Sequence, residues 1–117
     1  TQQAKLVASD IQAEDRFGEG VCIDNNGSHV VIGASREDGG AGDPYTSAGA
    51  AYIFKRDGST WTQIRKLAST TYTDTQQFGS FHGISISNDG KFITSGAPQT
   101  DISGLSAGGA AYIYEAG

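Results

Sequence analysis

The sequence has little of several residue types that stabilise small proteins. Its 117 residues include one cysteine, two prolines and no methionine. The single cysteine excludes an internal disulfide and a cysteine-based zinc site, and Cys22, between Val21 and Ile23, is predicted to be a small buried hydrophobic residue. No apolar run approaches the roughly 20 residues of a membrane-spanning helix, so we expect no membrane insertion.

Positive charge is also scarce. Eight Lys and Arg residues face 13 Asp and Glu residues, for a formal net charge of −5. The longest basic runs are the pairs Lys55-Arg56 and Arg65-Lys66, which are too short to follow a phosphate backbone. We therefore expect no nucleic-acid partner.

Glycine, in contrast, is abundant. The 17 glycines argue against a helical bundle, because each glycine inside a helix costs roughly 0.5–1 kcal/mol. Hydrophobic residues make up 37% of the chain, and its Tyr, Phe, Ile and Val content is too high for a disordered linker. A chain of this length is at most one domain.

The main signal is an internal repeat, because the chain matches itself at a shift of about 60 residues. The matching segments follow the same order in both copies: Thr1-Gln2 and Lys5-Leu6 with Thr62-Gln63 and Lys66-Leu67, Phe17-Gly18 with Phe78-Gly79, Asn26-Gly27 with Asp89-Gly90, Gly33-Ala34-Ser35 with Gly96-Ala97-Pro98, and Gly49 to Phe54 with Gly109 to Tyr114. So many matches in one order are hard to obtain by chance. The chain is therefore predicted to contain two copies of one unit.

Each unit is predicted to form four antiparallel strands and no helix. Asn26-Gly27 and Asp89-Gly90 indicate tight hairpins, because type I′ turns need positive φ at both central residues. The strands expected in the first unit lie around Val21 and Ile23, from His29 to Ile32, from Ala50 to Lys55 and from Thr60 to Leu67, with a turn from Arg56 to Ser59. Four antiparallel strands repeated in tandem are typical of β-propeller blades.

The repeated motifs also resemble a known family. Phe17-Gly18 with Gly33-Ala34-Ser35, and the matching segments of the second unit, are similar to the FG-GAP repeats of integrin α-subunit propellers. The bacterial and phage-associated form of the repeat is more similar still, through Asp-Arg-Phe-Gly at 15–18, Ala-Tyr-Ile-Phe at 51–54 and Trp-Thr-Gln at 61–63. The resemblance covers essentially the whole chain and implies an all-β fold of two four-stranded propeller blades.

The units are out of phase with the chain ends. Residues 1–117 are interpreted as one unit of two blades: residues 1–8 as an outer closing strand, 17–68 as the first blade and 78–117 as a second blade lacking its fourth strand. Two blades cannot enclose a ring, since propellers use about 4–8. The chain is therefore expected either to assemble with itself or to be a piece of a longer protein.

Self-assembly is expected to be head-to-tail. A trimer or a tetramer, giving six or eight blades, is favoured. One edge of the contact would consist of Gln2, Ala4 and Leu6, and the facing edge of Ala110, Tyr112 and Tyr114, joined by β-strand addition. Tyr52 and Phe54, like Tyr112 and Tyr114, occupy alternate positions, and we expect both pairs to pack between blades rather than to form a ligand platform.

The alternation of strand direction predicts one end of short turns, at 24–27, 56–59 and 88–90. The long loops 8–16, 36–48, 69–77 and 99–108 are expected at the other end, where loops on a rigid scaffold commonly bind ligands. The predicted ligand-binding residues are the charged and tyrosine side chains of this end: Asp10, Glu14, Asp15, Arg36, Glu37, Asp38, Asp43, Tyr45, Tyr72, Asp74 and Asp101. Carboxylates beside tyrosines suit sugar hydroxyls or a cationic partner; the alternative is a solvated acidic face that maintains solubility.

No cofactor and no metal are predicted. Integrin-type FG-GAP blades often carry a Ca²⁺ loop of alternating carboxylates, but the matching segments 24–29 and 87–92 are shortened to hairpin turns. A cation near Glu37, Asp38 and Asp43 is the alternative, although no known ligand spacing supports it. His82 has no serine or cysteine nucleophile at a diagnostic spacing, so the chain is not expected to be an enzyme.

These observations predict a non-enzymatic adhesion or recognition module that binds a protein or a glycan through its long-loop end. The alternative is a purely structural protein that self-assembles or decorates a surface or virion, and a hydrolase is the third hypothesis. The family resemblance implies an extracellular, cell-surface or virion location.

Overall fold

The computed structural model describes residues 1–10, 12, 14–36, 49–68, 83–97 and 109–116. Within these ranges the chain forms seven strands and no helix, which confirms the all-β prediction. The strands are β1 (Phe17–Ile23), β2 (His29–Ala34), β3 (Ala50–Asp57), β4 (Thr60–Leu67), β5 (Ile84–Ile86), β6 (Phe92–Ala97) and β7 (Ala110–Glu115). No segment in this part of the chain is a helix able to cross a membrane.

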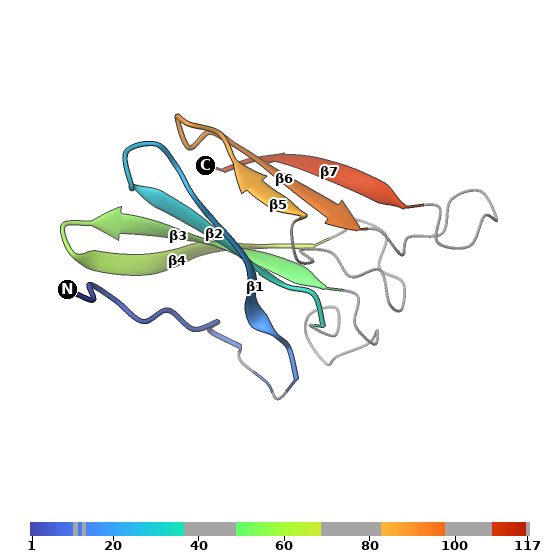
Figure 1. Ribbon diagram of the computed structural model, residues 1–117, viewed down its shortest axis with the longest axis horizontal. Coiled ribbons are helices and arrows are strands. Elements are labelled where there is room, and N and C mark those ends of the chain that lie inside the picture. The colour runs from blue at the N-terminus through green and yellow to red at the C-terminus, as the bar shows by residue number, and fades with distance from the viewer. Residues whose placement is uncertain (11, 13, 37–48, 69–82, 98–108, 117) are drawn as a thin grey trace.

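The strands form two antiparallel sheets, each a simple meander (Figure 1). The first sheet has the order β1-β2-β3-β4 and is called blade 1; the second has the order β5-β6-β7 and is called blade 2. Blade 1 contains two register shifts, one between Phe17 and Gly20 and one between Ile53 and Phe54. The fold is therefore that of β-propeller-type blades, and a single copy does not close a ring.

The tight hairpins follow from local chemistry. Gly27, at the end of the β1–β2 turn, has φ of 69°, and Gly58, in the β3–β4 turn, has φ of 63°. Residues with a Cβ rarely adopt these angles, so glycine fixes where each hairpin reverses. β2 then continues as a β-branched run, Val30-Val31-Ile32, whose residues are all buried.

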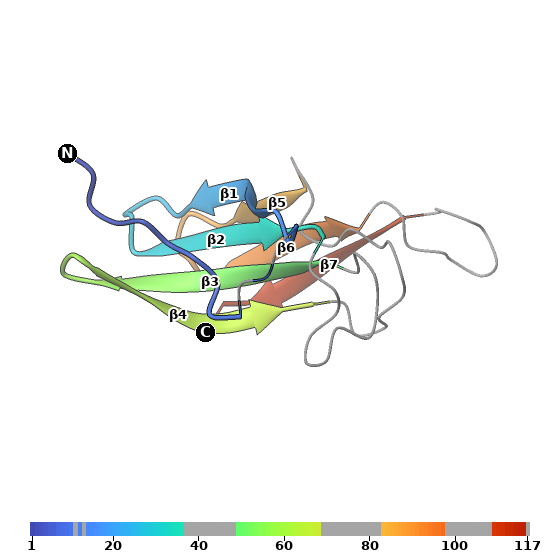
Figure 2. The ribbon, with the colours of Figure 1, turned by 90° about the horizontal axis from the view of Figure 1, so that it is seen from below.

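The core lies between the two blades, which pack face to face (Figure 2). The front face of blade 1 consists of Val31, Ala51, Ile53 and Leu67. It packs on the back face of blade 2, which consists of Ile84, Ile86, Ile93, Ser95, Ala97, Tyr112 and Tyr114. Full burial of a side chain such as Ile53 stabilises the folded state by about 1.5–3 kcal/mol. Tyr112 and Tyr114 therefore pack between blades, as predicted.

The back face of blade 1 carries Val21, Ile23, Val30, Ile32, Tyr52 and Phe54. The last four of these form a second buried cluster with Ala8 and Ala34. The ring of Phe17 meets the rings of Tyr52 and Phe54 edge to face, at centroid distances of 5.5 and 6.1 Å. Tyr52 and Phe54 differ from the prediction, because within one copy they pack under the chain's own residues 1–10 rather than between two blades.

Residues 1–10, called the N-terminal segment, run along the side of blade 1 that faces away from blade 2 (Figure 1). Residues 1–8 form no strand in the single copy. Leu6 packs on the back face of blade 1, and Nε1 of Trp61 donates a hydrogen bond to Oε1 of Gln3 at 2.8 Å. The segment is therefore held by side chains and not by a ladder of backbone hydrogen bonds.

Candidate functional site

The strand register separates long connections from short turns. Ala34 pairs with Ala50, Ala51 with Leu67, and Ala97 with Ala110. Each of these pairs lies where a strand meets one of the stretches 37–48, 69–82 or 98–108, so these stretches connect strands at one end of the blades, called the long-loop end. The tight turns lie at the opposite end, called the tight-turn end, as the alternation of strand direction predicts.

At the long-loop end, Asp10 is engaged in contacts within the chain. Its carboxylate accepts a hydrogen bond from the hydroxyl of Tyr52 at 2.8 Å and pairs with the ammonium of Lys66 at 2.5 Å. Burial tends to raise the pKa of Asp10, but the hydrogen bonds from Lys66 and Tyr52 outweigh it and lower the pKa below its ordinary value. Asp10 therefore anchors the N-terminal segment to blade 1.

Asp15 has a local structural role of the same kind. It is 4% exposed, its carboxylate accepts the backbone N–H of Gln12 at 3.2 Å, and its carbonyl accepts the backbone N–H of Arg36 at 3.2 Å. The hydroxyl of Ser35 donates a hydrogen bond to the carboxylate of Glu19 nearby. These contacts tie the approach to β1 to the end of β2.

The predicted ligand-binding residues thus divide into three groups. Asp10 and Asp15 are engaged within the fold, whereas Glu14 and Arg36 are exposed at the long-loop end. The other seven lie outside the described residues: Glu37, Asp38, Asp43, Tyr45, Tyr72, Asp74 and Asp101. The structure therefore brings four of the predicted residues to the expected end and leaves two of these free to face solvent.

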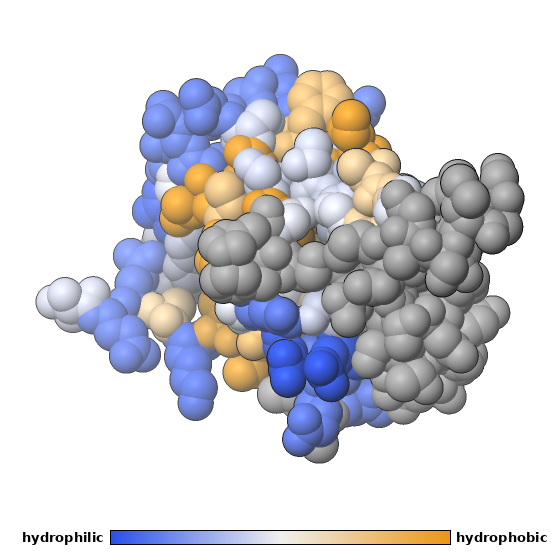
Figure 3. Space-filling view, turned by 45° about the vertical axis from the view of Figure 1, so that its right-hand side comes forward, coloured by the Kyte–Doolittle hydropathy of each residue, from blue (hydrophilic) through white to orange (hydrophobic). Residues whose placement is uncertain are grey.

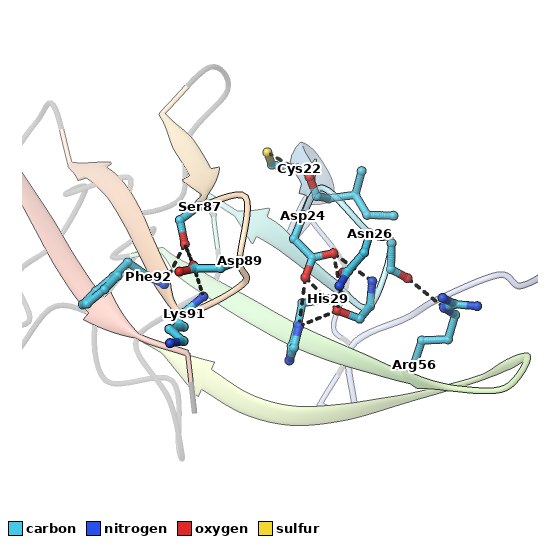
Figure 4. Close-up of polar contacts among 12 residues, drawn as sticks. Cys22, Asp24, Asn26, His29, Arg56, Ser87, Asp89, Lys91 and Phe92 are labelled. Atoms are coloured by element: carbon cyan, nitrogen blue, oxygen red, sulfur yellow. Dashed lines mark hydrogen bonds and ion pairs between the residues drawn. The ribbon is translucent and has the colours of Figure 1, made fainter.

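The tight-turn end contains a cluster that the sequence analysis missed (Figure 4). The Asp24 side chain is fully buried, and its carboxylate accepts the backbone N–H groups of Ser28 at 2.8 Å and His29 at 3.1 Å. The hydroxyl of Ser28 also donates to it at 2.8 Å, and Nδ1 of His29 lies 3.0 Å from its Oδ2. Burial tends to raise the pKa of Asp24, but these hydrogen bonds lower it to about 2.

The second unit repeats this arrangement with different residues. Ser87 stands where Asp24 stands in the first unit, and its hydroxyl accepts the backbone N–H of Phe92 at 3.0 Å. The carboxylate of Asp89 accepts the Ser87 hydroxyl at 2.7 Å and the backbone N–H of Lys91 at 3.0 Å. These two hydrogen bonds lower the pKa of Asp89. An acceptor side chain at the first turn position was a recognisable signal, because Asp and Ser commonly bond to nearby backbone N–H groups.

The two turns are stacked on each other. The backbone N–H of Asn25 donates to the carbonyl of Asn88 at 3.1 Å. A Cβ atom on Gly90 would lie 2.6 Å from Oδ2 of Asp24 and 2.7 Å from Nδ1 of His29. Only glycine fits at such a close approach, so this contact fixes how the blades meet at the tight-turn end.

A cavity of about 350 Å³ lies beside this contact. It is lined by His29, Asp89, Gly90, Lys91, Phe92 and Glu115. The lining residues provide a cation, two carboxylates and a phenyl ring, but no hydroxyl or thiol nucleophile.

The Asp24, Ser28 and His29 cluster is not arranged as a catalytic triad. In a triad the imidazole bridges the two partners, with the carboxylate at one ring nitrogen and the serine at the other. Here the Ser28 hydroxyl, at 3.1 Å, and the Asp24 carboxylate, at 3.0 Å, both approach Nδ1 of His29. The cluster therefore stabilises a turn and cannot activate Ser28 by this route.

No group of three or more potential ligands is placed to hold a metal ion in the part of the chain that the structure describes. The oxygens of Asp24 already accept hydrogen bonds from Ser28 and His29. Glu37, Asp38 and Asp43, the alternative cation ligands, lie outside the described residues, and so does His82.

The predicted interface residues lie on two separate surfaces. Leu6, from the N-terminal segment, contacts the back face of blade 1, and Gln2 and Ala4 are exposed on the same segment. Ala110, Tyr112 and Tyr114 belong to β7, which is the edge strand of blade 2 in the sheet order. The hydroxyl of Tyr114 donates to the carbonyl of Ala68 at 2.6 Å, so the side chain of this residue is engaged inside the copy, and among the described strands β7 is paired on one side, with β6.

Part of the chain matches a protein-family model. The model of the FG-GAP repeat matches residues 1–54, from the N-terminal segment to β3 of blade 1. No curated protein and no solved structure matched the chain. The matched range contains the Phe17-Gly18 and Gly33-Ala34 motifs, and the counterpart of the second motif, Gly96-Ala97, pairs with β7 as Gly33-Ala34 pairs with β3. Residues 1–54 are therefore similar to the FG-GAP repeat, which supports the family resemblance carried by the sequence motifs.

Proposed function

We propose that the chain is a non-enzymatic recognition module of the β-propeller type, which binds a protein or glycan ligand at its long-loop end. The observation that carries this proposal is the separation of the two ends of the blades. All long connections leave the strands where Glu14 and Arg36 are exposed, whereas the opposite end is closed by stacked tight turns. A rigid scaffold with its long connections at one end is a common arrangement for binding.

Backbone strain at the same end supports the proposal. Glu14 has φ of 69° and Arg16 has φ of 60°, both in the left-handed region although neither is glycine. Such conformations cost about 1–2 kcal/mol per residue and cluster at ligand-binding sites. Glu14 is exposed and lies three residues before the start of β1.

The test is binding of the labelled chain to an array of neutral and acidic oligosaccharides and to surface proteins. The variant Glu14→Gln with Arg36→Gln should lose at least about tenfold in affinity, because hydrogen bonds to charged groups contribute about 1.5–3 kcal/mol. Asp57→Asn, an exposed change at the tight-turn end, is the matched control and should bind within about twofold. Equal affinity of both variants, or loss in both, would contradict binding at the long-loop end.

A non-enzymatic role is proposed because the described Ser, His and Asp cluster lacks triad geometry. Hydrolase activity that disappears in the variant His82→Ala would contradict it. The FG-GAP resemblance also supports an extracellular, cell-surface or virion setting as part of the proposal.

A second function, structural self-assembly, is favoured by a different observation. Phe92 and Ile113 are large apolar residues on blade 2 that are 48% and 72% exposed. A soluble single copy gains nothing from such exposure, so their surface suits a protein partner.

A further inference from the structure

Because the two blades are repeats of one unit, the contact between blade 1 and blade 2 can serve as a template for a contact between two copies of the chain. Strand pairing fixes which residues correspond: Cys22 pairs with Val31 as Ser85 pairs with Thr94, and Val30 pairs with Phe54 as Ile93 pairs with Tyr114. Each residue of blade 1 can therefore be compared with its counterpart in blade 2. The comparison shows which surfaces are covered in one blade and open in the other.

The front face is covered in blade 1 and open in blade 2. Val31, Ala51 and Ile53 are fully buried against blade 2. Their counterparts Thr94, Ala111 and Ile113 are all exposed. Figure 3 shows apolar side chains reaching the surface at the top of the molecule, over blade 2. Among the described residues, the front face of blade 2 therefore has no neighbour like the one that covers the front face of blade 1.

The back face shows the opposite pattern. Ile86 of blade 2 is 8% exposed because it packs on blade 1, but its counterpart Ile23 is 54% exposed. Ile84 of blade 2 is half-buried, whereas its counterpart Val21 is 60% exposed. The back face of blade 1 thus has an open apolar half formed by Val21 and Ile23.

The other half of that back face is already covered in a specific way. Leu6 packs on the cluster that contains Tyr52 and Phe54. Its counterpart Leu67, at the end of β4, belongs to the cluster on which Tyr112 and Tyr114 pack. The N-terminal segment therefore lies on blade 1 as the fourth strand of a preceding blade would, and blade 2 is the described blade that has no fourth strand beside its β7 edge.

We propose that a second copy of this chain docks head-to-tail on the back face of blade 1. The front face of its blade 2 covers Val21 and Ile23, and the N-terminal segment, without leaving its place, pairs with the partner's β7 edge as that blade's fourth strand. Within one copy, His29 of blade 1 lies over Gly90 of blade 2. Phe92 is the counterpart of His29, and Gly27 is the counterpart of Gly90, so Phe92 of the second copy lies over Gly27. In the single copy a Cβ atom on Gly27 would meet Cδ1 of Ile23 at 4.0 Å, an ordinary van der Waals distance.

This proposal depends on the blade-type fold and not on ligand binding at the long-loop end, so the two can fail independently. The contact is heterologous: each copy offers one back face and one front face. A heterologous contact generates either a closed ring or an open filament, and we expect a ring of three or four copies.

The first experiment measures the mass of the 117-residue chain by native mass spectrometry and light scattering over about 1–200 μM. We expect a particle of three or four copies of the 12.1 kDa chain. Val21→Asp on the back face and Ile113→Asp on the front face should each leave single copies. Ile64→Asp is the matched control, because Ile64 is 41% exposed but belongs to neither proposed face. A wild-type chain that stays single throughout the range would overturn the proposal.

The second experiment mixes the two single-copy variants. Ile113→Asp keeps its back face and Val21→Asp keeps its front face, so the mixture should form a one-to-one dimer through the one intact contact. A two-fold contact between identical faces predicts no such dimer. If both variants retain the circular dichroism spectrum of β-structure and no dimer forms, the head-to-tail arrangement is overturned. In the wild type, amide exchange along β7 and residues 2–8 should slow as the chain concentration rises; unchanged exchange contradicts strand pairing.

Discussion

Nδ1 of His29 lies 3.0 Å from Oδ2 of Asp24, and both side chains press against the turn of the next blade at Gly90. One carboxylate therefore closes the hairpin of blade 1 and also contacts blade 2. The hydrogen bonds that it accepts from Ser28 and His29 keep it charged despite complete burial of its side chain. This cluster is where local turn chemistry and blade packing meet.

Replacing this carboxylate should destabilise the fold. In Asp24→Asn one acceptor oxygen becomes a donor that faces the N–H and O–H donors of Ser28 and His29. The free energy of unfolding, measured by urea denaturation at pH 7, should fall by about 2 kcal/mol, since hydrogen bonds to charged groups contribute about 1.5–3 kcal/mol. Asp57→Asn, at an exposed position of another turn, should change it by less than about 0.5 kcal/mol. Equal stability of the two variants would show that the Asp24 network is not a stabilising feature.

The same residue predicts a dependence of stability on pH. The pKa of Asp24 is about 2 in the folded chain against 3.8 ordinarily. The unfolded state therefore binds the proton first as pH falls, and the stabilisation, about 2 kcal/mol, is complete above pH 4 and is lost between about pH 4 and pH 2. Urea midpoints measured across this range should fall more steeply for the wild type than for Asp24→Asn. Asp10 and Asp89 also have lowered pKa values, so the variant should keep a smaller slope.

The stacking of the turns can be tested through two glycines with similar backbone angles. Gly90 has φ of 74° and no room for a Cβ, whereas Gly58 has φ of 63° and nothing within 4 Å of an added Cβ. Gly58→Ala should cost only the conformational strain, about 1–2 kcal/mol. Gly90→Ala should cost at least about 1 kcal/mol more, because its Cβ must displace Asp24 and His29. Denaturation of both variants measures the difference, and equal losses would argue against a tight contact between the turns.

Much of the fold was predictable because it depends on neighbouring residues. The glycine turns and β-branched runs predicted β2 and β4 with nearly their observed bounds. Residues 1–8 resemble β4 but form no strand in one copy, because they lie over the back face of blade 1, where Leu6 and Ala8 pack, and not alongside a sheet edge. Sequence similarity predicts the conformation that a segment can adopt, but not whether a partner edge is within reach.

The predicted site was harder to infer for a related reason. Asp10 is a charged residue in a predicted loop, as ligand-binding residues often are. In the structure, however, its carboxylate contacts Tyr52 and Lys66, which are distant in sequence. The sequence predicts Asp24 only as part of a turn, because the groups that donate hydrogen bonds to its carboxylate leave no trace in a hydrophobic pattern. Side chains that meet across the fold are what sequence patterns leave undetermined.

The anchor of the N-terminal segment should be separable from the core. Tyr52→Phe removes the hydrogen bond to Asp10 but keeps the ring, and should lower the free energy of unfolding by about 1 kcal/mol. Trypsin cleavage after the exposed Lys5 should become faster, because the segment opens more often. Tyr114→Phe loses a comparable hydrogen bond, to Ala68, and should leave cleavage after Lys5 unchanged. Faster cleavage in both variants would indicate general loosening and not a local anchor.

Two isoleucines at corresponding positions of the blades provide the last prediction. Ile53 is fully buried between the blades and Ile113 is 72% exposed, although both occupy the same place in β3 and β7. At about 1 μM chain, Ile53→Ala should lower the free energy of unfolding by about 2–4 kcal/mol and Ile113→Ala by less than about 0.5 kcal/mol. At about 100 μM the loss for Ile113→Ala should grow, because association stabilises the folded state by mass action and this residue would then be buried by a second copy. A loss for Ile113→Ala that stays small at every concentration would mean that this face meets no partner copy, while leaving the packing of Ile53 intact.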